Sequence, residues 1–342
     1  MQALGLTVER VEFGAVEAEW RELFACCDPA YPFLSPTWQR IWWEEFGDRS
    51  GQRTAASPSA EGQEPVLLRV TDGGKACALV PLMREGDTIT FAGNTSICDY
   101  MDIVGASEDR SALLEAVLRS LGEEPWSELV LWAVREDSPT FKALPGVCTS
   151  LGLSCETEVE DVCPQLDLPG DWEEYLAGLD KKDRHELRRK LRKLSQGGEP
   201  ELEVLTSADD VTVAMDDFLN QHKTSRADKE TFMTPQMEGF FRRVVPAIAA
   251  DGGVEMTFLK LGGVRAACVL CFRTECDLLL YNSGYEKAYA GLSVGLLSKA
   301  MALQRAIEQG MRRFDFLRGA EPYKYDLGAK DVSVYRCVIR RT

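Results

Sequence analysis

The sequence predicts an α/β protein in which two similar lobes follow one another along the chain. The chain has 342 residues, of which 45% are hydrophobic, and this is enough for two hydrophobic cores. Short segments of strand-like alternation are interspersed with longer segments whose apolar residues recur every three or four positions. The order of these segments in the C-terminal half recurs in the N-terminal half without similarity in letters, which favours a tandem repeat of one fold.

The C-terminal half has the clearer pattern. A strand at 201–206 precedes one helix that begins at Ser207, a good N-capping residue, and a second helix that begins at Thr234 and Pro235. A meander of three strands, a helix, a strand and a final strand should follow. These elements are expected at 254–261, 264–273, 278–284, 293–309, 312–317 and 332–341.

The N-terminal half repeats this order more loosely, and its polar residues 48–65 are expected to form an exposed loop. We place the division between the lobes near residue 160. The N-terminal lobe then covers 1–160, and the C-terminal lobe covers 161–342 with a basic helix at 172–195. The N-terminal elements are expected at 7–13, 17–27, 36–46, 66–71, 76–84, 88–92, 109–121 and 128–134.

Composition excludes several classes of protein. A net charge of −16 disfavours binding of DNA and of anionic membranes. No apolar run approaches the ~20 residues of a membrane-spanning helix, and the first residues lack a signal-peptide core, so we expect a cytoplasmic protein without membrane insertion. The eleven cysteines have no metal-ligand spacing, and we expect reduced core residues and no metal site.

A glycine-flanked turn leads from a strand into a helix at 289–297. Gly291 and Gly295 would let backbone approach a ligand, and the amides of the first helical turn suit phosphate oxygens. Taken by themselves, the glycines are better explained by an ordinary start of a helix with a small residue at a packing contact. The equivalent turn of the N-terminal half, 105–113, has Glu108 and Asp109 at the start of the helix, where carboxylates would repel phosphate.

The sequence resembles the bacterial GNAT family associated with cellulose and exopolysaccharide biosynthesis. The most specific segments are FDFLRGAEPYKYDLGAKD at 314–331 and YNSGYEKAYAGLSVGLL at 281–297. The helix around His222 lacks the tryptophan that this family often has shortly after that histidine. Supporting segments are PFLSPTWQRIWW at 32–43, VPLM at 80–83, DYMD at 99–102 and LDKKDRHELRRKLRKLSQGG at 179–198.

The resemblance implies two tandem GNAT folds with mixed, mainly antiparallel sheets, related in architecture to the Fem-type peptidyltransferases. It implies transfer of an acyl group, most simply acetyl, from acyl-CoA to the amine of a small molecule or amino sugar. The cofactor would bind in the C-terminal lobe, whereas the N-terminal lobe would have no cofactor turn. The residues that would bind it are Tyr285, Lys287, Gly291, Leu292, Ser293, Val294, Gly295 and Leu296.

Four residues near the end of the C-terminal lobe are candidate catalytic groups. Acyl transfer to nitrogen requires an uncharged amine, a polarised carbonyl and a proton for the leaving thiolate. Tyr323 would protonate the thiolate, and Lys324 would stabilise the oxyanion or hold an anionic acceptor; a packed Tyr323 and a solvated Lys324 is the alternative. Asp315 and Glu321 are candidate bases, although a buried Asp315 could instead pair with an arginine such as Arg318 or Arg336.

Candidate acceptor contacts are spread over the chain. His222 shares a helical face with apolar residues, so it is either an acceptor contact or a core histidine. Asp99 and Tyr100 occupy a turn that matches the family block, and Arg188 lies in the basic segment 181–193, where eight Lys and Arg outnumber two acidic residues. This basic segment could be a solvated helix, a surface for an anionic acceptor, or a tRNA-binding face.

Two other functions remain open from the sequence. A Fem-like aminoacyltransferase would bind aminoacyl-tRNA through the basic segment with steep salt dependence and would have no affinity for acyl-CoA. A non-catalytic binding protein with the same fold would tolerate replacement of Tyr323 and Lys324.

Overall fold

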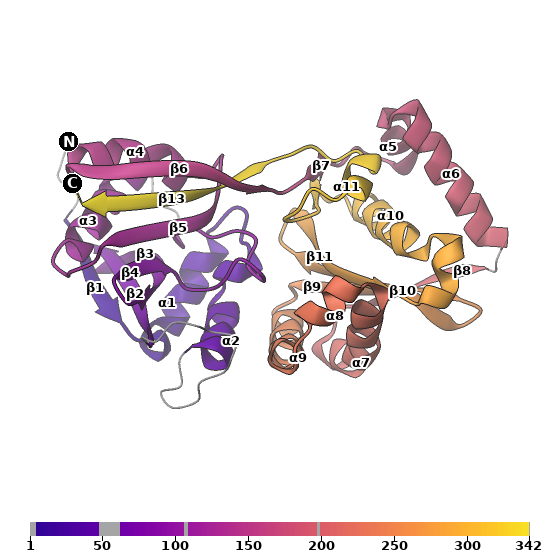
Figure 1. Ribbon diagram of the computed structural model, residues 1–342, viewed down its shortest axis with the longest axis horizontal. Helices are drawn as coiled ribbons and strands as arrows, with labels where there is room; N and C mark the ends of the chain where they lie inside the picture. Colours follow the sequence, from indigo (N-terminus) through magenta and orange to yellow (C-terminus); the bar gives the residue numbers. More distant parts are fainter. Residues whose placement is uncertain (1–4, 48–61, 106–108, 197–198, 342) are drawn as a thin grey trace. The chain divides into compact units, whose positions relative to one another are not determined.

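A computed structural model describes residues 5–47, 62–105, 109–196 and 199–341, which form two compact units. Unit 1 comprises residues 1–162 together with 332–342, and unit 2 comprises residues 163–331 (Figure 1). Most of the loop expected at 48–65, and Glu108 as well, lie outside the described residues.

Unit 1 contains a seven-stranded sheet in the order β1-β2-β3-β4-β5-β13-β6. All neighbouring strands are antiparallel except β4 and β5, which are parallel and are connected through α3. The strands are β1 (Leu6–Val11), β2 (Gln63–Asp72), β3 (Lys75–Glu85), β4 (Thr88–Phe91), β5 (Glu128–Arg135), β6 (Leu153–Val162) and β13 (Ser333–Arg341). The helices are α1 (Phe13–Ala25), η1 (Pro32–Leu34), α2 (Pro36–Phe46), α3 (Arg110–Leu121) and α4 (Pro139–Ser150).

The C-terminal strand β13 belongs to unit 1, not to the second lobe to which the sequence assigned residues 332–341. It inserts between β5 and β6 and pairs antiparallel with both. The division at residue 160 is therefore close to the first crossing between the units, at residues 162 and 163, but misses the return of the chain at 332. Strand pairing is non-local, so an alternating apolar pattern gives no information about the sheet that a strand joins.

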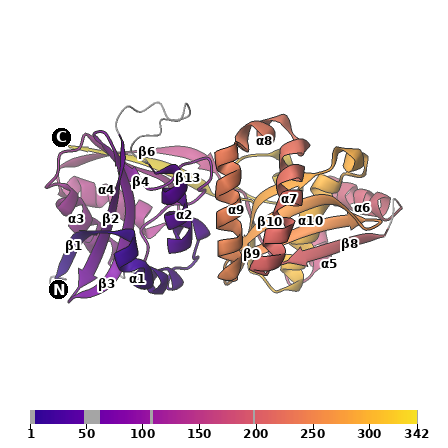
Figure 2. The ribbon, with the colours of Figure 1, turned by 90° about the horizontal axis from the view of Figure 1, so that it is seen from below.

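Unit 2 contains a six-stranded sheet in the order β7-β12-β11-β10-β9-β8, in which only β11 and β12 are parallel. Figures 1 and 2 show α7, α8 and α9 on one face of this sheet and α10 on the other. The strands are β7 (Gln165–Asp167), β8 (Pro200–Leu205), β9 (Val254–Leu261), β10 (Val264–Arg273), β11 (Asp277–Tyr285) and β12 (Arg313–Asp315). The helices are α5 (Trp172–Gly178), α6 (Lys181–Gln196), α7 (Ala208–Ser225), α8 (Ala227–Phe232), α9 (Pro235–Ala250), η2 (Lys287–Leu292), α10 (Val294–Glu308) and α11 (Pro322–Asp326).

The two units repeat one arrangement, and the predicted α/β fold with two mixed, mainly antiparallel sheets is confirmed. In both units a strand, a set of helices and a three-strand meander are followed by a helix and a strand parallel to the third strand of the meander. Several elements differ from expectation, and helices α4, α8 and α11 and strands β6 and β7 were not expected. The basic helix expected at 172–195 is two helices, α5 and α6, and the strand expected at 312–317 is the short β12.

Strand β11 has an irregular edge that positions the candidate site. It pairs with β12 only over Asp277–Leu279, so within the described chain residues 280–285 have a strand neighbour on one side only, β10. The register shifts between Leu270 and Cys271, which leaves Tyr281 as an extra residue on β11. We call residues 280–285 the unpaired edge of β11.

Helix α7 lies directly against this stretch of β11. A Cβ atom at Gly284 would be 2.4 Å from the carbonyl carbon of Gln221 and from the amide nitrogen of His222, so only glycine permits this approach. The contact places His222 beside Asn282 of β11, at a Nε2 to Oδ1 distance of 2.8 Å.

Candidate functional site

The turn between β11 and α10 has free backbone groups at the start of a long helix. Ser293, the N-cap of α10, has a left-handed conformation with φ of 58°, and its side chain accepts no hydrogen bond from the first turn of the helix. Gly291 is exposed, and a Cβ atom there would have no neighbour within 4 Å. The turn therefore offers an accessible backbone without a capping side chain, which suits a phosphate group.

Gly295 is required for packing. A Cβ atom at this position would lie 2.8 Å from Cδ1 of Tyr285, whose ring covers the start of α10. The side chain of Val294 is fully buried, and those of Leu292 and Leu296 pack partly against the core. Of the residues proposed for the cofactor, these three would contribute backbone atoms, whereas the side chain of Lys287 is exposed.

Helix α6 lies beside this turn, a proximity that the sequence did not predict. Lys193 Nζ donates a hydrogen bond of 2.8 Å to the carbonyl oxygen of Gly291. The basic helix thus brings a positive charge to the same turn whose amides face outward from α10, and both features favour an anion.

Arg188 lies on the exposed surface of α6. Its guanidinium forms an ion pair of 2.7 Å with Glu173 of α5. A pocket of about 700 Å³ surrounds this part of α6. Its lining residues are Lys181, Lys182, Arg184, His185, Glu186 and Arg188.

Lys324 is buried and is held by the loop before α11. Its Nζ donates three hydrogen bonds of 2.8–2.9 Å to the carbonyl oxygens of Leu317, Arg318 and Gly319, and it lies 2.9 Å from Oε2 of Glu321. Because an ammonium has three protons, these carbonyl groups satisfy it completely. The geometry therefore excludes the alternative of a solvated Lys324 and favours a positioning role over direct stabilisation of an oxyanion.

Asp315 is also part of this loop structure. It is 1% exposed and accepts hydrogen bonds from Gln165 Nε2 at 2.7 Å and from the amide of Leu317 at 2.8 Å. Leu317 has φ of 55°, an unfavourable conformation for a residue with a Cβ atom, which Asp315 and Lys324 hold from its two sides. Arg336, considered as a partner for Asp315, instead pairs with Glu158 in unit 1.

Tyr323 has a free hydroxyl group beside this loop. Its ring packs edge-on against Phe316, and Lys299 Nζ lies 5.0 Å from the centre of the ring. Burial, with a smaller effect from Glu321, raises the pKa of Tyr323, so the phenol keeps its proton at neutral pH. Among the described residues its hydroxyl group has no hydrogen-bond partner, which leaves it available to a ligand.

His222 is 1% exposed and is neutral at physiological pH. Burial and the charge of Lys229 lower its pKa to about 4, against a smaller opposing effect of Asn282. With Nε2 donating to Asn282, Nδ1 is a buried acceptor that has no hydrogen-bond partner in the described structure. Because this buried nitrogen has no partner among the described residues, His222 differs from a core histidine whose two ring nitrogens are both hydrogen-bonded.

The sequence analysis missed two lysines of this region, of which Lys229 is half-buried and Lys299 is buried. Lys229 lies on α8, and Lys299 lies on α10. A signal existed for Lys299, because it is three and four residues before the buried Ala302 and Leu303 and thus lies on the buried face of its helix.

Asp99 and Tyr100 lie in unit 1. Tyr100 is 1% exposed, its ring centre is 4.4 Å from that of Tyr31, and the guanidinium of Arg135 lies 5.0 Å from it. These contacts make Tyr100 part of an aromatic and arginine cluster in the core of unit 1. Asp99 is half-buried in the same turn.

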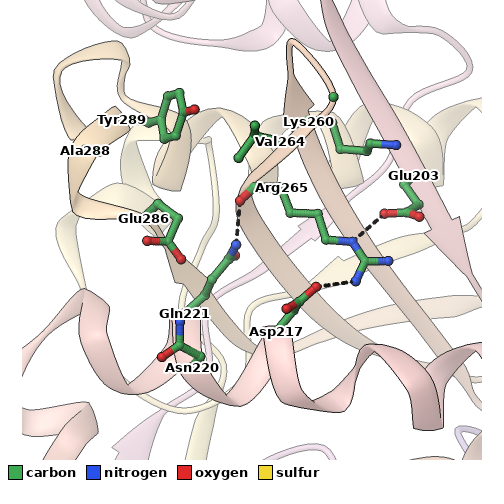
Figure 3. A pocket seen from close by; sticks show the side chains of 11 residues that line it. Glu203, Asp217, Asn220, Gln221, Lys260, Val264, Arg265, Glu286, Ala288 and Tyr289 are labelled. Carbon is green, nitrogen blue, oxygen red and sulfur yellow. Dashed lines mark hydrogen bonds and ion pairs between the residues drawn. The ribbon is translucent and has the colours of Figure 1, made fainter.

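A separate pocket of about 500 Å³ opens between α7, the β9–β10 hairpin and η2. Figure 3 shows that Arg265 bridges Glu203 and Asp217, with both ion-pair distances at 2.7 Å, while Gln221 donates to the Arg265 carbonyl. The charge of Arg265 is neutralised by these carboxylates, and none of the four candidate catalytic residues lines this pocket.

Neither a metal centre nor a membrane-spanning helix is found in the described residues. The part of the chain covered by the structure has no group of three or more His, Cys, Asp or Glu side chains arranged to hold a metal ion. In the same part, no helix is long and apolar enough to cross a membrane.

Comparison with protein families gives a match in the C-terminal part of the chain. Residues 181–325 match the family described as acetyltransferase (GNAT) domain. Among curated proteins, none has a significant sequence match to the chain.

Two solved structures share the fold over almost the whole chain. FemX has 11% identity, covers 96% of this chain and 96% of its own, and gives a TM-score of 0.62. A conserved protein of unknown function from Bacteroides thetaiotaomicron has 12% identity, covers 97% and 99%, and gives 0.61. A tandem GNAT protein from the clavulanic acid biosynthesis pathway is more distant, with 14% identity over 97% and 98% and a TM-score of 0.47.

The chain therefore has the tandem two-unit fold that FemX also has, and its residues 181–325 are similar to the acetyltransferase (GNAT) domain family. The matched range includes the turn 291–296, the unpaired edge of β11 and Tyr323. The fold resemblance to FemX agrees with the Fem-related architecture expected from the sequence.

Proposed function

We propose that the chain is an N-acyltransferase that transfers an acyl group, most simply acetyl, from acyl-CoA to the amine of a small molecule or an amino sugar. The observation that carries this proposal is the GNAT domain match over 181–325, within which the uncapped start of α10 offers a phosphate site. Lys193, bound to Gly291, adds positive charge beside it. An amino sugar of exopolysaccharide biosynthesis is the acceptor that the sequence resemblance suggests.

In the proposed reaction, Tyr323 and Glu321 take part in proton transfer. The amine nitrogen attacks the thioester carbonyl, a C–N bond forms, and the C–S bond breaks. Tyr323 gives its phenolic proton to the departing thiolate, and the proton released by the nitrogen returns the phenolate to phenol through Glu321 or water. Glu321 is the better base of the two carboxylates because its side chain is 44% exposed, whereas Asp315 is buried with two hydrogen-bond donors.

Lys324 and Asp315 act as positioning residues in this proposal. They hold residues 315–319 in a strained conformation next to Tyr323, and thereby fix the position of the general acid. His222 contributes an acceptor contact through its unpartnered Nδ1.

Calorimetric titration with acetyl-CoA and free CoA at two salt concentrations tests the donor. Saturable binding of both is expected. Release of thiol with a panel of amino sugars and small amines then tests the chemistry, and Tyr323→Phe should lower kcat by about 100-fold with unchanged affinity for acetyl-CoA. Equal turnover by Tyr323→Phe would remove Tyr323 from the mechanism.

A second candidate is an aminoacyl-tRNA-dependent transferase. Lys181, Lys182 and Arg192 are exposed on α6 and have no ion-pair or hydrogen-bond partner for their side chains within the described residues, so they are available to a polyanion. This function predicts no affinity for acyl-CoA and binding of tRNA that weakens steeply with salt. A non-catalytic binding protein would bind a ligand without any thiol release.

A further inference from the structure

Two lysines approach the unpaired edge of β11 from opposite faces of the sheet in unit 2. Lys229 lies on α8 and Lys299 on α10, and these helices cover different faces (Figures 1 and 2). Lys229 Nζ donates to the carbonyl oxygen of Ser283 at 2.5 Å, and Lys299 Nζ donates to that of Gly295 at 2.6 Å. Ser283 belongs to the unpaired edge.

The two ammonium groups are close enough to influence one another. Burial and then the charge of Lys229 lower the pKa of Lys299 to about 7. A continuous sheet would separate side chains on its two faces. The carbonyl groups that the two lysines contact lie near one another, because Gly295 packs against Tyr285, two residues after Ser283, in the stretch of β11 that β12 no longer pairs.

Within the described residues neither ammonium has an acceptor for each of its N–H donors, although Lys299 also lies over the ring of Tyr323. Each has three N–H donors but only one hydrogen-bond acceptor among the described residues, and in that same part of the chain neither forms an ion pair with a carboxylate. Lys299 is 8% exposed, so water has little access to its remaining donors. Buried cations are normally paired or coordinated, because desolvation of an unpaired charge is costly.

Lys324 in the same unit shows how a structural buried lysine is accommodated. It has three carbonyl acceptors and a carboxylate, and no donor is left over. Lys229 and Lys299 each lack the acceptors that Lys324 has. His222, whose pKa is affected by the charge of Lys229, adds a buried polar group with an unpartnered atom.

We propose that Lys229 and Lys299 bind an anionic group of the substrate, a carboxylate or a phosphate, beside the unpaired edge of β11. This inference rests on the proposed function and names the chemical class of its substrate. The anion has two chemical sources: an acceptor that carries an acid group as well as its amine, or an acyl group that ends in a carboxylate.

The carboxylates near the two lysines form their ion pairs with other cations. Asp228 forms an ion pair with Arg226, and Glu321 forms one with Lys324, so both nearby carboxylates already have cationic partners. Cys268 is buried, and burial raises its pKa to about 12, so it is a neutral thiol. The titratable and charged groups that influence the two lysines are His222, Arg226, Asp228, Cys268, Glu321 and Tyr323.

Calorimetric titration of the full chain with inorganic phosphate and with succinate tests the site. Wild type should bind at least one of them saturably, and Lys299→Met and Lys229→Met should each weaken that binding by about 10-fold or more. Lys330→Met, which removes an exposed lysine of unit 2, should bind as wild type does. Unchanged binding in both Lys229→Met and Lys299→Met, or no binding by wild type, would overturn the proposal.

Two further readouts separate a binding role from a structural role. Lys299→Met should unfold at the same or a higher temperature than wild type, because an apolar side chain of similar volume replaces a desolvated cation. In wild type the affinity for the anion should fall as pH rises above about 7, by up to about 10-fold per pH unit, since the anion favours the protonated lysine. An affinity independent of pH between 6 and 9 would contradict a role for Lys299.

Acyl-CoA titrations distinguish the two sources of the anion and keep this inference separate from the proposed function. If the acyl group supplies the anion, wild type prefers succinyl-CoA to acetyl-CoA and Lys299→Met loses that preference. If the acceptor supplies it, the two thioesters bind equally and succinate still binds with CoA present. Acetyl-CoA binding without anion binding would overturn only this inference, whereas anion binding without acyl-CoA binding would overturn the proposed donor.

Discussion

Helix α3 of unit 1 and helix α10 of unit 2 occupy the same position between two parallel strands, but their first turns differ. Asp109 caps α3, and its carboxylate accepts a hydrogen bond of 2.9 Å from the amide of Ala112. Ser293 begins α10 in a left-handed conformation without a capping side chain. In unit 1 a carboxylate of the protein therefore caps the N-terminus of the helix, whereas in unit 2 no side chain among the described residues caps it.

The strand after each helix shows a second contrast. In unit 1, Ala133 of β5 has positive φ, and its amide donates to the carboxylate of Glu160. In unit 2, Leu317, two residues after β12, has positive φ, and its amide donates to the carboxylate of Asp315. Beyond this shared feature, unit 1 has packed aromatic rings around Arg135, and unit 2 has Tyr323 with buried lysines. Both units thus contain a residue with positive φ at this place in the repeat, and the side chains around it differ.

An acidic cap at the start of α10, like that of α3, should have the largest effect on ligand affinity. Ser293→Asp places a carboxylate at the start of α10, and aspartate tolerates the left-handed conformation. The affinity for acetyl-CoA should fall by about 100-fold through repulsion of its phosphates, whereas the neutral Ser293→Asn should stay within about threefold of wild type. Calorimetric titration measures both. Equal affinities for the two variants would mean that the turn 291–296 does not hold the phosphates.

Replacing Lys324 tests whether unit 2 needs its internal cation for structure. Lys324→Met leaves three carbonyl groups without a donor and Glu321 without its partner, and should lower the free energy of unfolding by about 2–3 kcal/mol. Denaturant titration gives this value. Normal stability combined with a large loss of kcat would restore the direct role in oxyanion stabilisation that the sequence suggested.

Acid should destabilise unit 2 through His222. Its pKa is about 4 in the folded state against 6.5 in the unfolded chain, so the unfolded state takes up the proton first as pH falls. This loss of stability is absent above pH 6.5 and reaches about 2 kcal/mol at pH 5. Unfolding of wild type and His222→Gln at pH 7.5 and pH 5 checks it. A pH dependence that is identical in the two proteins would mean that His222 titrates normally.

Local patterns predicted much of the fold. Pro36, Ser207 and Thr234 mark helix starts that the structure places within one residue of expectation, because caps and proline act through neighbouring backbone atoms. The partners of Asp315 could not be predicted in this way. Gln165 is 150 residues away in sequence and reaches Asp315 only because β7 pairs with β12.

Candidate site residues were predicted in type but not in role. The turn 291–296, Tyr323 and His222 were visible as residues that suit acyl transfer, and they remain candidates. Lys324 and Lys299 could not be told apart by sequence, since both are lysines near apolar residues. They differ in the number of carbonyl oxygens that accept from each Nζ. Every residue has a backbone carbonyl, so the sequence does not show which of these groups surround a given lysine.

The sequence by itself determined the tandem α/β repeat, the glycine-flanked turn of the second repeat and the negative charge at the start of the equivalent helix in the first. Periodicity, capping and charge are local properties, so they can be read from neighbouring residues. Only the tertiary structure decided that β13 returns to unit 1, that α6 reaches the turn at Gly291, and that Lys229 donates to the carbonyl group of Ser283 in β11. Each of these depends on contacts between distant segments, and such contacts are set by packing of the whole unit.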